Sequence, residues 1–165
     1  MKILGIDPGP GESGWMTLWK QANGVQFANC GNVLSKRDAF IELLDAESPD
    51  VVSIERPKWQ DHGKNGVATR AIASNLIETN YVVARFAEIA VARGMKLLEI
   101  PAQTWRLGLL RSRSPSDAQI KRAVVELVQG LPSRTNAHER DAGGVAIAAL
   151  RVVGTRAEGT YVAGF

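Results

Sequence analysis

The stretch Lys2-Ile3-Leu4-Gly5-Ile6-Asp7-Pro8-Gly9 governs the expected fold, because a short apolar run of strand length ends abruptly in an acid and a turn. A carboxylate at the end of a buried strand is costly unless a metal ion or a hydrogen-bond donor compensates it. Pro8-Gly9 takes the chain out of the sheet at once. Asp7 is therefore expected at the rim of a central strand, facing whatever satisfies it. Taken alone, Asp-Pro-Gly is also the common sequence of a capped turn.

Length and composition indicate one ordinary globular domain. The chain has 165 residues, 45% of them apolar and 22% charged, which is enough to bury a real core. Cys30 is the single cysteine, so no disulfide framework exists within the chain. The N-terminus lacks the apolar core of a signal peptide, and no apolar run approaches the ~20 residues of a membrane span. These features predict a soluble, cytoplasmic protein.

The glycine-rich stretch after Asp7 imitates a nucleotide-binding motif. Gly9-Pro10-Gly11-Glu12-Ser13-Gly14 fits G-x-G-x-x-G, but that fingerprint requires a helix to open there. The residues that follow, Trp15-Met16-Thr17-Leu18-Trp19, are aromatic and β-prone instead. We therefore expect strands over 14–20 and 25–33, reversed at Asn23-Gly24. The first three strands then form an antiparallel meander.

The remainder of the chain alternates helices and strands. Val51-Val52-Ser53-Ile54-Glu55 is a second apolar strand that ends in an acid, and it is expected to add parallel to the first strand through a right-handed crossover. The other expected elements are a helix over 35–47 capped by Ser35, a loop over 56–68, a long helix over 69–93, a strand over 96–100, a short helix opened by Pro101, a helix capped by Ser114, and a last helix over 136–150. The pattern predicts an α/β fold with a mixed five-stranded sheet, in which the meander is joined by parallel strands at 51–55 and 96–100 and flanked by helices.

The last helix carries a second polar cluster. His138 and Asp141 are three residues apart and share one helical face, which continues with small apolar residues that must pack on the sheet. Gly143 and Gly144 are poor helix formers, and their expected use is a close helix–sheet approach. The alternative reading is that both polar side chains only cap the helix.

The acids Asp7, Glu55 and Asp141 are expected to meet at one edge of the sheet, with no basic residue among them. Carboxylates so placed repel one another, and divalent cations relieve the repulsion. Oxygen ligands suit Mg²⁺ or Mn²⁺, and the imidazole of His138 is tolerated better by Mn²⁺. Two such ions about 4 Å apart would activate a water and stabilise the leaving oxygen of a phosphodiester.

Positive charge is concentrated in two stretches. Residues 56–70 carry four bases against one acid (+3) and residues 104–122 carry five against one (+4), so the rest of the chain is −4 within a total of +3. Each stretch alone reads as a solvated loop, but two with tryptophans favour a surface that follows phosphates. The residues expected to contact DNA are Arg56, Lys58, Trp59, Lys64, Arg70, Arg106, Arg111, Arg113, Lys121 and Arg122.

With Gly5-Ile6-Asp7-Pro8-Gly9, Ile54-Glu55 and His138-x-x-Asp141-Ala142 in this order, the chain resembles the RuvC family of Holliday junction resolvases, within the RNase H-like fold. The resemblance spans residues 1–152 as one nuclease domain and leaves 153–165 as a loosely ordered tail. It implies a metal-dependent endonuclease of DNA recombination and repair that nicks opposite strands of a four-way junction symmetrically.

The resemblance also implies residue roles and an oligomeric state. It assigns Asp7, Glu55, His138 and Asp141 to catalysis and to a site for two Mg²⁺ or Mn²⁺ ions, and it matches Trp59 to an aromatic that wedges into the junction. It implies a homodimer, and the helix at 69–93, which is apolar over more than the usual stripe, is expected to face the partner subunit. Relatives often place a lysine in the first turn of the helix where this chain has Lys121 one turn later, which leaves DNA register open.

Other readings lead to different chemistry. An actin-like or sugar-kinase-like ATPase also begins with a strand, an Asp and glycines, but it needs two such domains, and 165 residues supply one. A less selective RNase H-like nuclease acting on flaps, forks or RNA–DNA hybrids stays open, because selectivity depends on dimer geometry. A catalytically silent junction-binding protein is disfavoured, since it has no reason to keep the whole ligand set.

Overall fold

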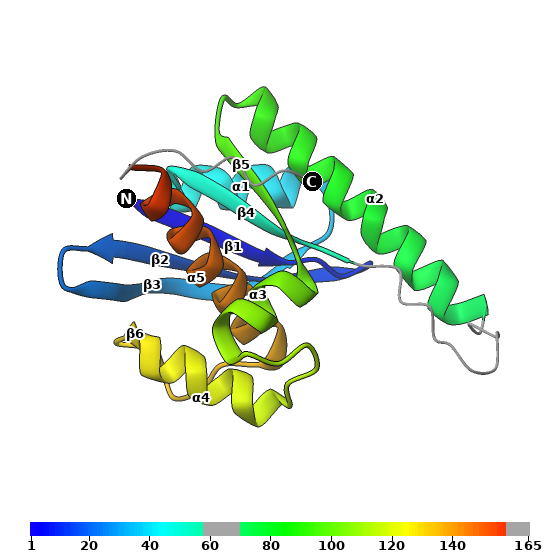
Figure 1. Ribbon diagram of the computed structural model, residues 1–165. Coiled ribbons are helices and arrows are strands. Elements are labelled where there is room, and N and C mark those ends of the chain that lie inside the picture. The colour runs from blue at the N-terminus through cyan, green and yellow to red at the C-terminus, as the bar shows by residue number, and fades with distance from the viewer. Residues whose placement is uncertain (58–69, 158–165) are drawn as a thin grey trace.

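The structure is a computed structural model that describes residues 1–57 and 70–157. Along the chain these residues form β1 (Lys2–Asp7), β2 (Glu12–Gln21), β3 (Gly24–Leu34), α1 (Arg37–Glu47), β4 (Val51–Arg56), α2 (Arg70–Ala92), β5 (Lys96–Pro101), α3 (Ala102–Leu110), α4 (Asp117–Leu127), β6 (Val128–Gln129) and α5 (Ala137–Ala157). The strands make one mixed sheet in the order β5-β4-β1-β2-β3-β6. Figure 1 shows α5 crossing one face of this sheet, with α1 and α2 on the other.

The pairing of the strands confirms the predicted meander and its parallel extension. β1, β2 and β3 are antiparallel neighbours, β4 adds parallel to β1, and β5 adds parallel to β4. The register pairs Ile6 with Ile54, so the acids that follow, Asp7 and Glu55, end adjacent strands at the same edge. The glycine-rich stretch after Asp7 connects β1 to β2 without a helix, which confirms that it is no dinucleotide fingerprint.

The predicted five strands were one too few. β6 is a two-residue strand that pairs parallel with β3, Val128 beside Val25 and Gln129 beside Gln26. It immediately follows α4. Two residues show no alternation of apolar and polar side chains, and that alternation is the signal by which a strand is found in a sequence.

Both predicted serine caps were wrong, for different reasons. The N-cap of α1 is Lys36, which makes no side-chain cap, because the Ser35 hydroxyl instead donates to the carbonyl of Gly9 at 2.7 Å. The N-cap of α4 is Ser116 rather than Ser114, and it forms a capping box with Gln119. A side-chain acceptor at the third helical position makes Ser116 the better cap, whereas at Ser35 a tertiary partner overrides the local pattern.

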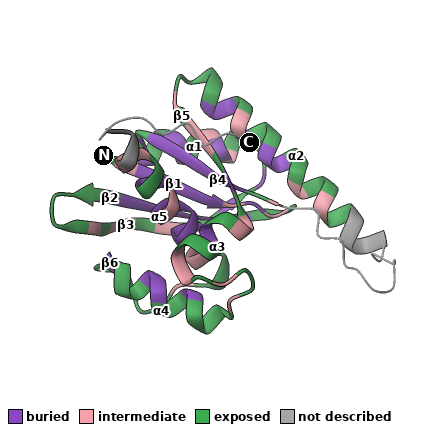
Figure 2. Cartoon of the chain, in the orientation of Figure 1, coloured by how far each residue is buried: buried purple, intermediate pink, exposed green. Residues whose placement is uncertain are grey.

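The two faces of the sheet carry separate cores, as the alternation along β1 requires. Leu4 and Ile6 pack with residues of α1 and α2, where Phe40 and Phe86 stack with ring centroids 3.9 Å apart. Ile3 packs on the opposite face, in the cluster that contains the buried residues of α5. Figure 2 shows that β1 and β4 are buried, whereas β3 and β5 are largely exposed or half-buried.

Glycines allow α5 to lie close to the sheet, as predicted. A Cβ on Gly5 would collide with the carbonyl oxygen of Ala142, and a Cβ on Gly143 would lie 2.8 Å from the Met16 sulfur. α5 continues to Ala157, past the predicted boundary at 152/153. The division into domain and tail stays a prediction. Among the described residues no helix has the length and apolarity that crossing a membrane demands.

Candidate active site

Two acids come from neighbouring strands. Side chains on β1 alternate between the two faces: a Cβ on Gly5 would point at α5, and Asp7, two residues on, faces the same way. Glu55 follows the β4 residue paired with Ile6 and is buried, with 8% of its surface exposed. Parallel pairing of β1 with β4 is therefore what sets these two carboxylates side by side.

The first turns of α5 supply the other two predicted residues. His138 Nδ1 lies 2.6 Å from Asp7 Oδ2, while most of the imidazole remains exposed. A Cβ on Gly14, the β2 partner of Asp7, would lie 2.5 Å from the His138 backbone. Only a glycine there lets the start of α5 come this close. The hydrogen bond to the Asp7 carboxylate is the main cause that raises the pKa of His138.

Two adjacent residues of α3, Trp105 and Arg106, donate hydrogen bonds to the acids. The sequence had predicted a DNA contact for Arg106 and no role at the site for Trp105. The buried Trp105 donates from its indole nitrogen to Glu55 Oε2 at 2.7 Å. Arg106 Nη2 lies 3.3 Å from Asp141 Oδ2, with its guanidinium 5.2 Å from the centroid of the Trp105 ring. A signal for both existed: β5 lies parallel beside β4, so the helix opening after Pro101 must begin next to Glu55.

Arg106 corrects one prediction and changes another. The expectation that no basic residue lies among the carboxylates was wrong, because Arg106 pairs with Asp141 and its charge also lowers the pKa of Glu55. Arg106 was also predicted to contact DNA, but in this structure its guanidinium points toward the acids. The reason is the position of α3, which begins directly after β5 at the edge of the sheet where Glu55 lies.

The acids lie close enough to raise one another's pKa values. Burial, and then the charges of Asp7 and Asp141, raise the pKa of Glu55 to about 7. Burial and Asp7 likewise raise the pKa of Asp141 to about 6, against the opposing effect of Arg106. Burial also raises the pKa of Asp7 above its ordinary value, although His138 opposes this. Such a cluster holds more negative charge than its surroundings neutralise, and added positive charge would stabilise it.

The donor chemistry suits a hard divalent cation, although the side chains are not arranged around one. Among residues 1–57 and 70–157, no group of three or more His, Cys, Asp or Glu side chains has the spacing that holds a metal ion. Each acid is instead engaged by a protein partner: Asp7 by His138, Glu55 by Trp105 and Asp141 by Arg106. Three carboxylates with raised pKa values still fit the oxygen-rich set that Mg²⁺ and Mn²⁺ prefer, and Trp105 donates to only one oxygen of Glu55.

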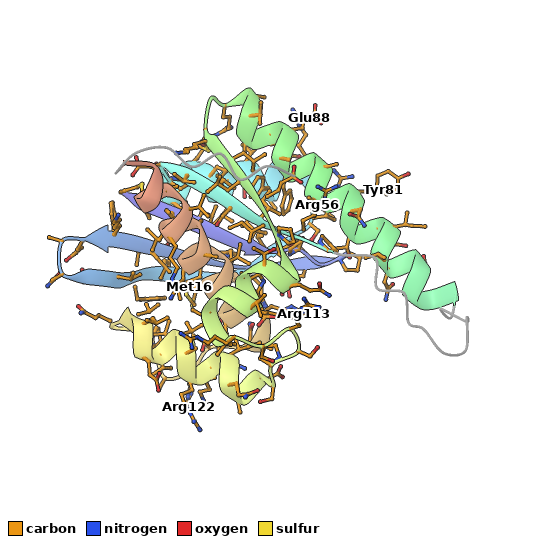
Figure 3. All side chains as sticks on the ribbon, in the orientation of Figure 1. Met16, Arg56, Tyr81, Glu88, Arg113 and Arg122 are labelled. Atoms are coloured by element: carbon orange, nitrogen blue, oxygen red, sulfur yellow. The ribbon has the colours of Figure 1, made fainter. Side chains whose placement is uncertain are left out.

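The expected DNA-contacting residues divide into described and undescribed ones. Lys58, Trp59, Lys64 and the side chain of Arg70 lie outside the part that the structure describes. The other predicted residues besides Arg106 are all exposed, and they are Arg56, Arg111, Arg113, Lys121 and Arg122. Figure 3 shows Arg113 on the connection between α3 and α4 and Arg122 pointing outward from α4. Their exposure is compatible with a phosphate-binding surface that begins beside the acids.

Comparison with known proteins identifies the fold. The sequence matches no family model and no curated protein. Thermus thermophilus RuvC in complex with a Holliday junction substrate gives a TM-score of 0.70 at 16% identity, covering 94% of this chain and 97% of that chain. The fowlpox virus Holliday junction resolvase gives 0.61 at 12% identity, covering 93% and 99%. The yeast mitochondrial resolvase Ydc2 gives 0.56 at 16% identity, covering 89% and 75%. The chain therefore has the RNase H-like fold of these resolvases, as expected from its sequence.

Proposed function

We propose that this chain is an endodeoxyribonuclease that resolves four-way DNA junctions by metal-dependent hydrolysis of phosphodiester bonds. One observation carries the proposal: acids from β1, β4 and α5 converge at one sheet edge and raise one another's pKa values. The shared fold supports it over nearly the whole length of the chain, because a structural relative is seen with a Holliday junction substrate.

Asp7, Glu55 and Asp141, with His138, are the residues that would hold Mg²⁺ or Mn²⁺, with two ions expected. Bound ions of this kind supply an activated water and stabilise the leaving oxygen. The remaining work falls to the chain. His138 orients the Asp7 carboxylate through its 2.6 Å hydrogen bond, and Arg106 offsets part of the negative charge at Asp141.

Junction binding is assigned to the exposed bases near this site. Arg56 follows Glu55 directly, and Arg111 and Arg113 follow α3, so these cations lie on segments that leave the acidic edge. Lys121 and Arg122 extend the positive surface along α4. Contacts of this type go to phosphates and give affinity without sequence selectivity. Lys58, Trp59, Lys64 and Arg70 complete the proposed surface.

A homodimer through α2 supports paired, symmetrical nicks. The exposed residues of α2 include a stripe with 4-3-4-3 spacing, which is typical of a helix that packs on another helix. Its members are Ile77, Tyr81, Ala84, Glu88 and Val91. Figure 3 shows Tyr81 and Glu88 pointing away from the body of the protein. Exposed apolar side chains in such a row are compatible with a second copy of the helix as partner.

The decisive experiment compares four labelled substrates: a four-way junction, a flap, a linear duplex and an RNA–DNA hybrid. With Mg²⁺ or Mn²⁺ we expect paired nicks near the crossover of the junction, and none when EDTA replaces the metal. Cleavage of the hybrid alone would favour a ribonuclease, and equal cleavage of all branched DNA would favour a less selective nuclease. Binding without any cleavage would favour a silent junction-binding protein.

The matched control variant is Asp7→Asn. It keeps the size of the side chain but removes one charge from the acidic cluster, and we expect it to bind the junction and not to cleave it. Cleavage at the wild-type rate by Asp7→Asn would contradict the assignment of the acids.

A further inference from the structure

α3 engages the acidic site with two consecutive side chains, and the first of them has no assigned role. We propose that Trp105 is a positioning residue that fixes the carboxylate of Glu55 for metal binding. The inference rests on the proposed function, since it concerns the same acidic site. Trp105, which is buried like a core residue, would thus orient a residue that binds the metal ion.

The contact itself is short, buried and directional. The indole nitrogen of Trp105 lies 2.7 Å from Glu55 Oε2, and the ring is 1% exposed. An indole N–H can only donate, so its partner must be an acceptor at this point in space. The bond holds one oxygen of Glu55 and thereby orients the plane of the carboxylate.

The indole is itself held in place. A Cβ on Gly144 of α5 would lie 2.5 Å from the Trp105 ring, so the helix packs directly on the aromatic face. The Arg106 guanidinium lies 5.2 Å from the ring centroid. Trp105 also belongs to the core cluster that contains the buried residues of α5. A donor packed in this way orients its acceptor before the ion binds, which is what a preorganised ligand requires.

The position in the fold separates this role from ordinary packing. A buried tryptophan that only fills space can satisfy its N–H with any nearby carbonyl. Here the acceptor is the carboxylate of Glu55, which follows the β4 residue paired with Ile6 and has 8% of its surface exposed. The donor is therefore satisfied by a residue of the acidic site and not by a backbone carbonyl of the core.

The test replaces the N–H and leaves the shape. β-(3-Benzothienyl)alanine, in which sulfur takes the place of the indole N–H, is introduced at position 105, and Trp105→Phe provides a second variant. Trp19→Phe is the matched control, since Trp19 is 41% exposed and pairs with Lys2 at the opposite end of β1. Three quantities are measured: the rise in melting temperature with Mg²⁺, junction affinity in EDTA, and the single-turnover cleavage rate.

We expect the isostere to lower the cleavage rate about 10- to 100-fold, the usual effect of losing a partner of a metal ligand. The Mg²⁺ concentration that gives half of the thermal shift should rise, while junction affinity in EDTA stays at the wild-type value. An isostere with wild-type cleavage and Mg²⁺ dependence would overturn the inference. So would losses confined to metal-free melting temperature and junction affinity.

Failure of the proposed function is distinguishable from failure of this inference. If the wild type cleaves no DNA, the proposed function is wrong, but the Mg²⁺-dependent thermal shift of wild type and isostere still decides the role of Trp105. Equal shifts would then overturn it, and a weaker shift in the isostere would support it.

Discussion

Burial and the neighbouring acids Asp7 and Asp141 raise the pKa of Glu55, and the hydrogen bond from Trp105 opposes them. The pKa of Glu55 therefore differs between the folded and the unfolded protein. Its pKa rises from an ordinary 4.5 to about 7. A raised carboxyl pKa means that the folded protein binds the proton more tightly than the unfolded chain does. The metal-free fold is therefore stabilised by protonated Glu55 at low pH, and this stability is lost as pH rises from about 4.5 through about 7. The raised pKa values of Asp141 and His138 act in the same direction.

Glu55→Gln tests this directly. Glutamine stays neutral, so the variant should melt at a higher temperature than the wild type at pH 8 in EDTA, with the difference disappearing toward pH 4.5. The free-energy difference at pH 8 is on the order of 3 kcal/mol, from a rise of roughly 2.5 pH units in the pKa. Melting curves at four pH values in EDTA give the difference. A gap that does not change with pH would show that Glu55 titrates normally.

The acids of the site were predictable because each stands out from its own element. Asp7 and Glu55 end apolar strands, and His138 and Asp141 share the face of α5 that packs on the sheet. Arg106 and Trp105 were not recognised as their partners. A basic residue in a basic stretch looks like a DNA contact, and an indole near it looks like a stacking residue. Only the parallel pairing of β5 with β4 shows that both belong to the acidic edge.

At the scale of elements, the fit of α5 against β1, β2 and α3 depends on glycines that a helix would otherwise avoid. Gly143 and Gly144 weaken α5 locally, but Gly144 admits the Trp105 ring. The close approach was foreseen from their low helix propensity. The partner of Gly144 was not, since no pattern within α5 names a residue of α3.

Gly144→Ala and Gly154→Ala form a matched pair within α5. Both changes improve helix propensity by up to about 1 kcal/mol. At Gly144 the new methyl would meet the Trp105 ring, and we expect a net loss of about 1–3 kcal/mol. At Gly154 the nearest atom is the flexible Lys20 Nζ at 3.0 Å, so no loss is expected. Chemical denaturation measures both, and equal stability of the two variants would argue against close packing on Trp105.

For the whole molecule, a dimer formed through α2 would contain two acidic sites, and two sites are what paired symmetrical nicks require. The exposed stripe on α2 differs in part from the sequence expectation. The helix was expected to be apolar over more than one stripe, and Val82, Phe86 and Ile89 are buried in the core that α2 shares with α1 and the sheet. Ile77 and Val91 remain outside at 51% and 60% exposure. The period of the helix was clear from the sequence, whereas which of its two apolar faces meets the sheet depends on packing.

Tyr81→Arg tests the dimer. Tyr81 is 68% exposed, so the change should leave the fold intact while placing two like charges across the proposed interface. We expect the dimer dissociation constant to rise by roughly 30-fold or more, as for loss of a central aromatic. Sedimentation equilibrium measures it, with Val125→Arg on the exposed side of α4 as the control. A wild type that is monomeric throughout, or a Tyr81→Arg protein as dimeric as the wild type, would exclude α2 as the interface.

The convergence of the acids on a metal ion underlies the whole account, and anomalous scattering from crystals grown with Mn²⁺ tests it most directly. We predict anomalous peaks within coordination distance of Asp7, Glu55 and Asp141, and their loss in crystals of Asp7→Asn. Mn²⁺ bound only elsewhere on the protein would contradict the account.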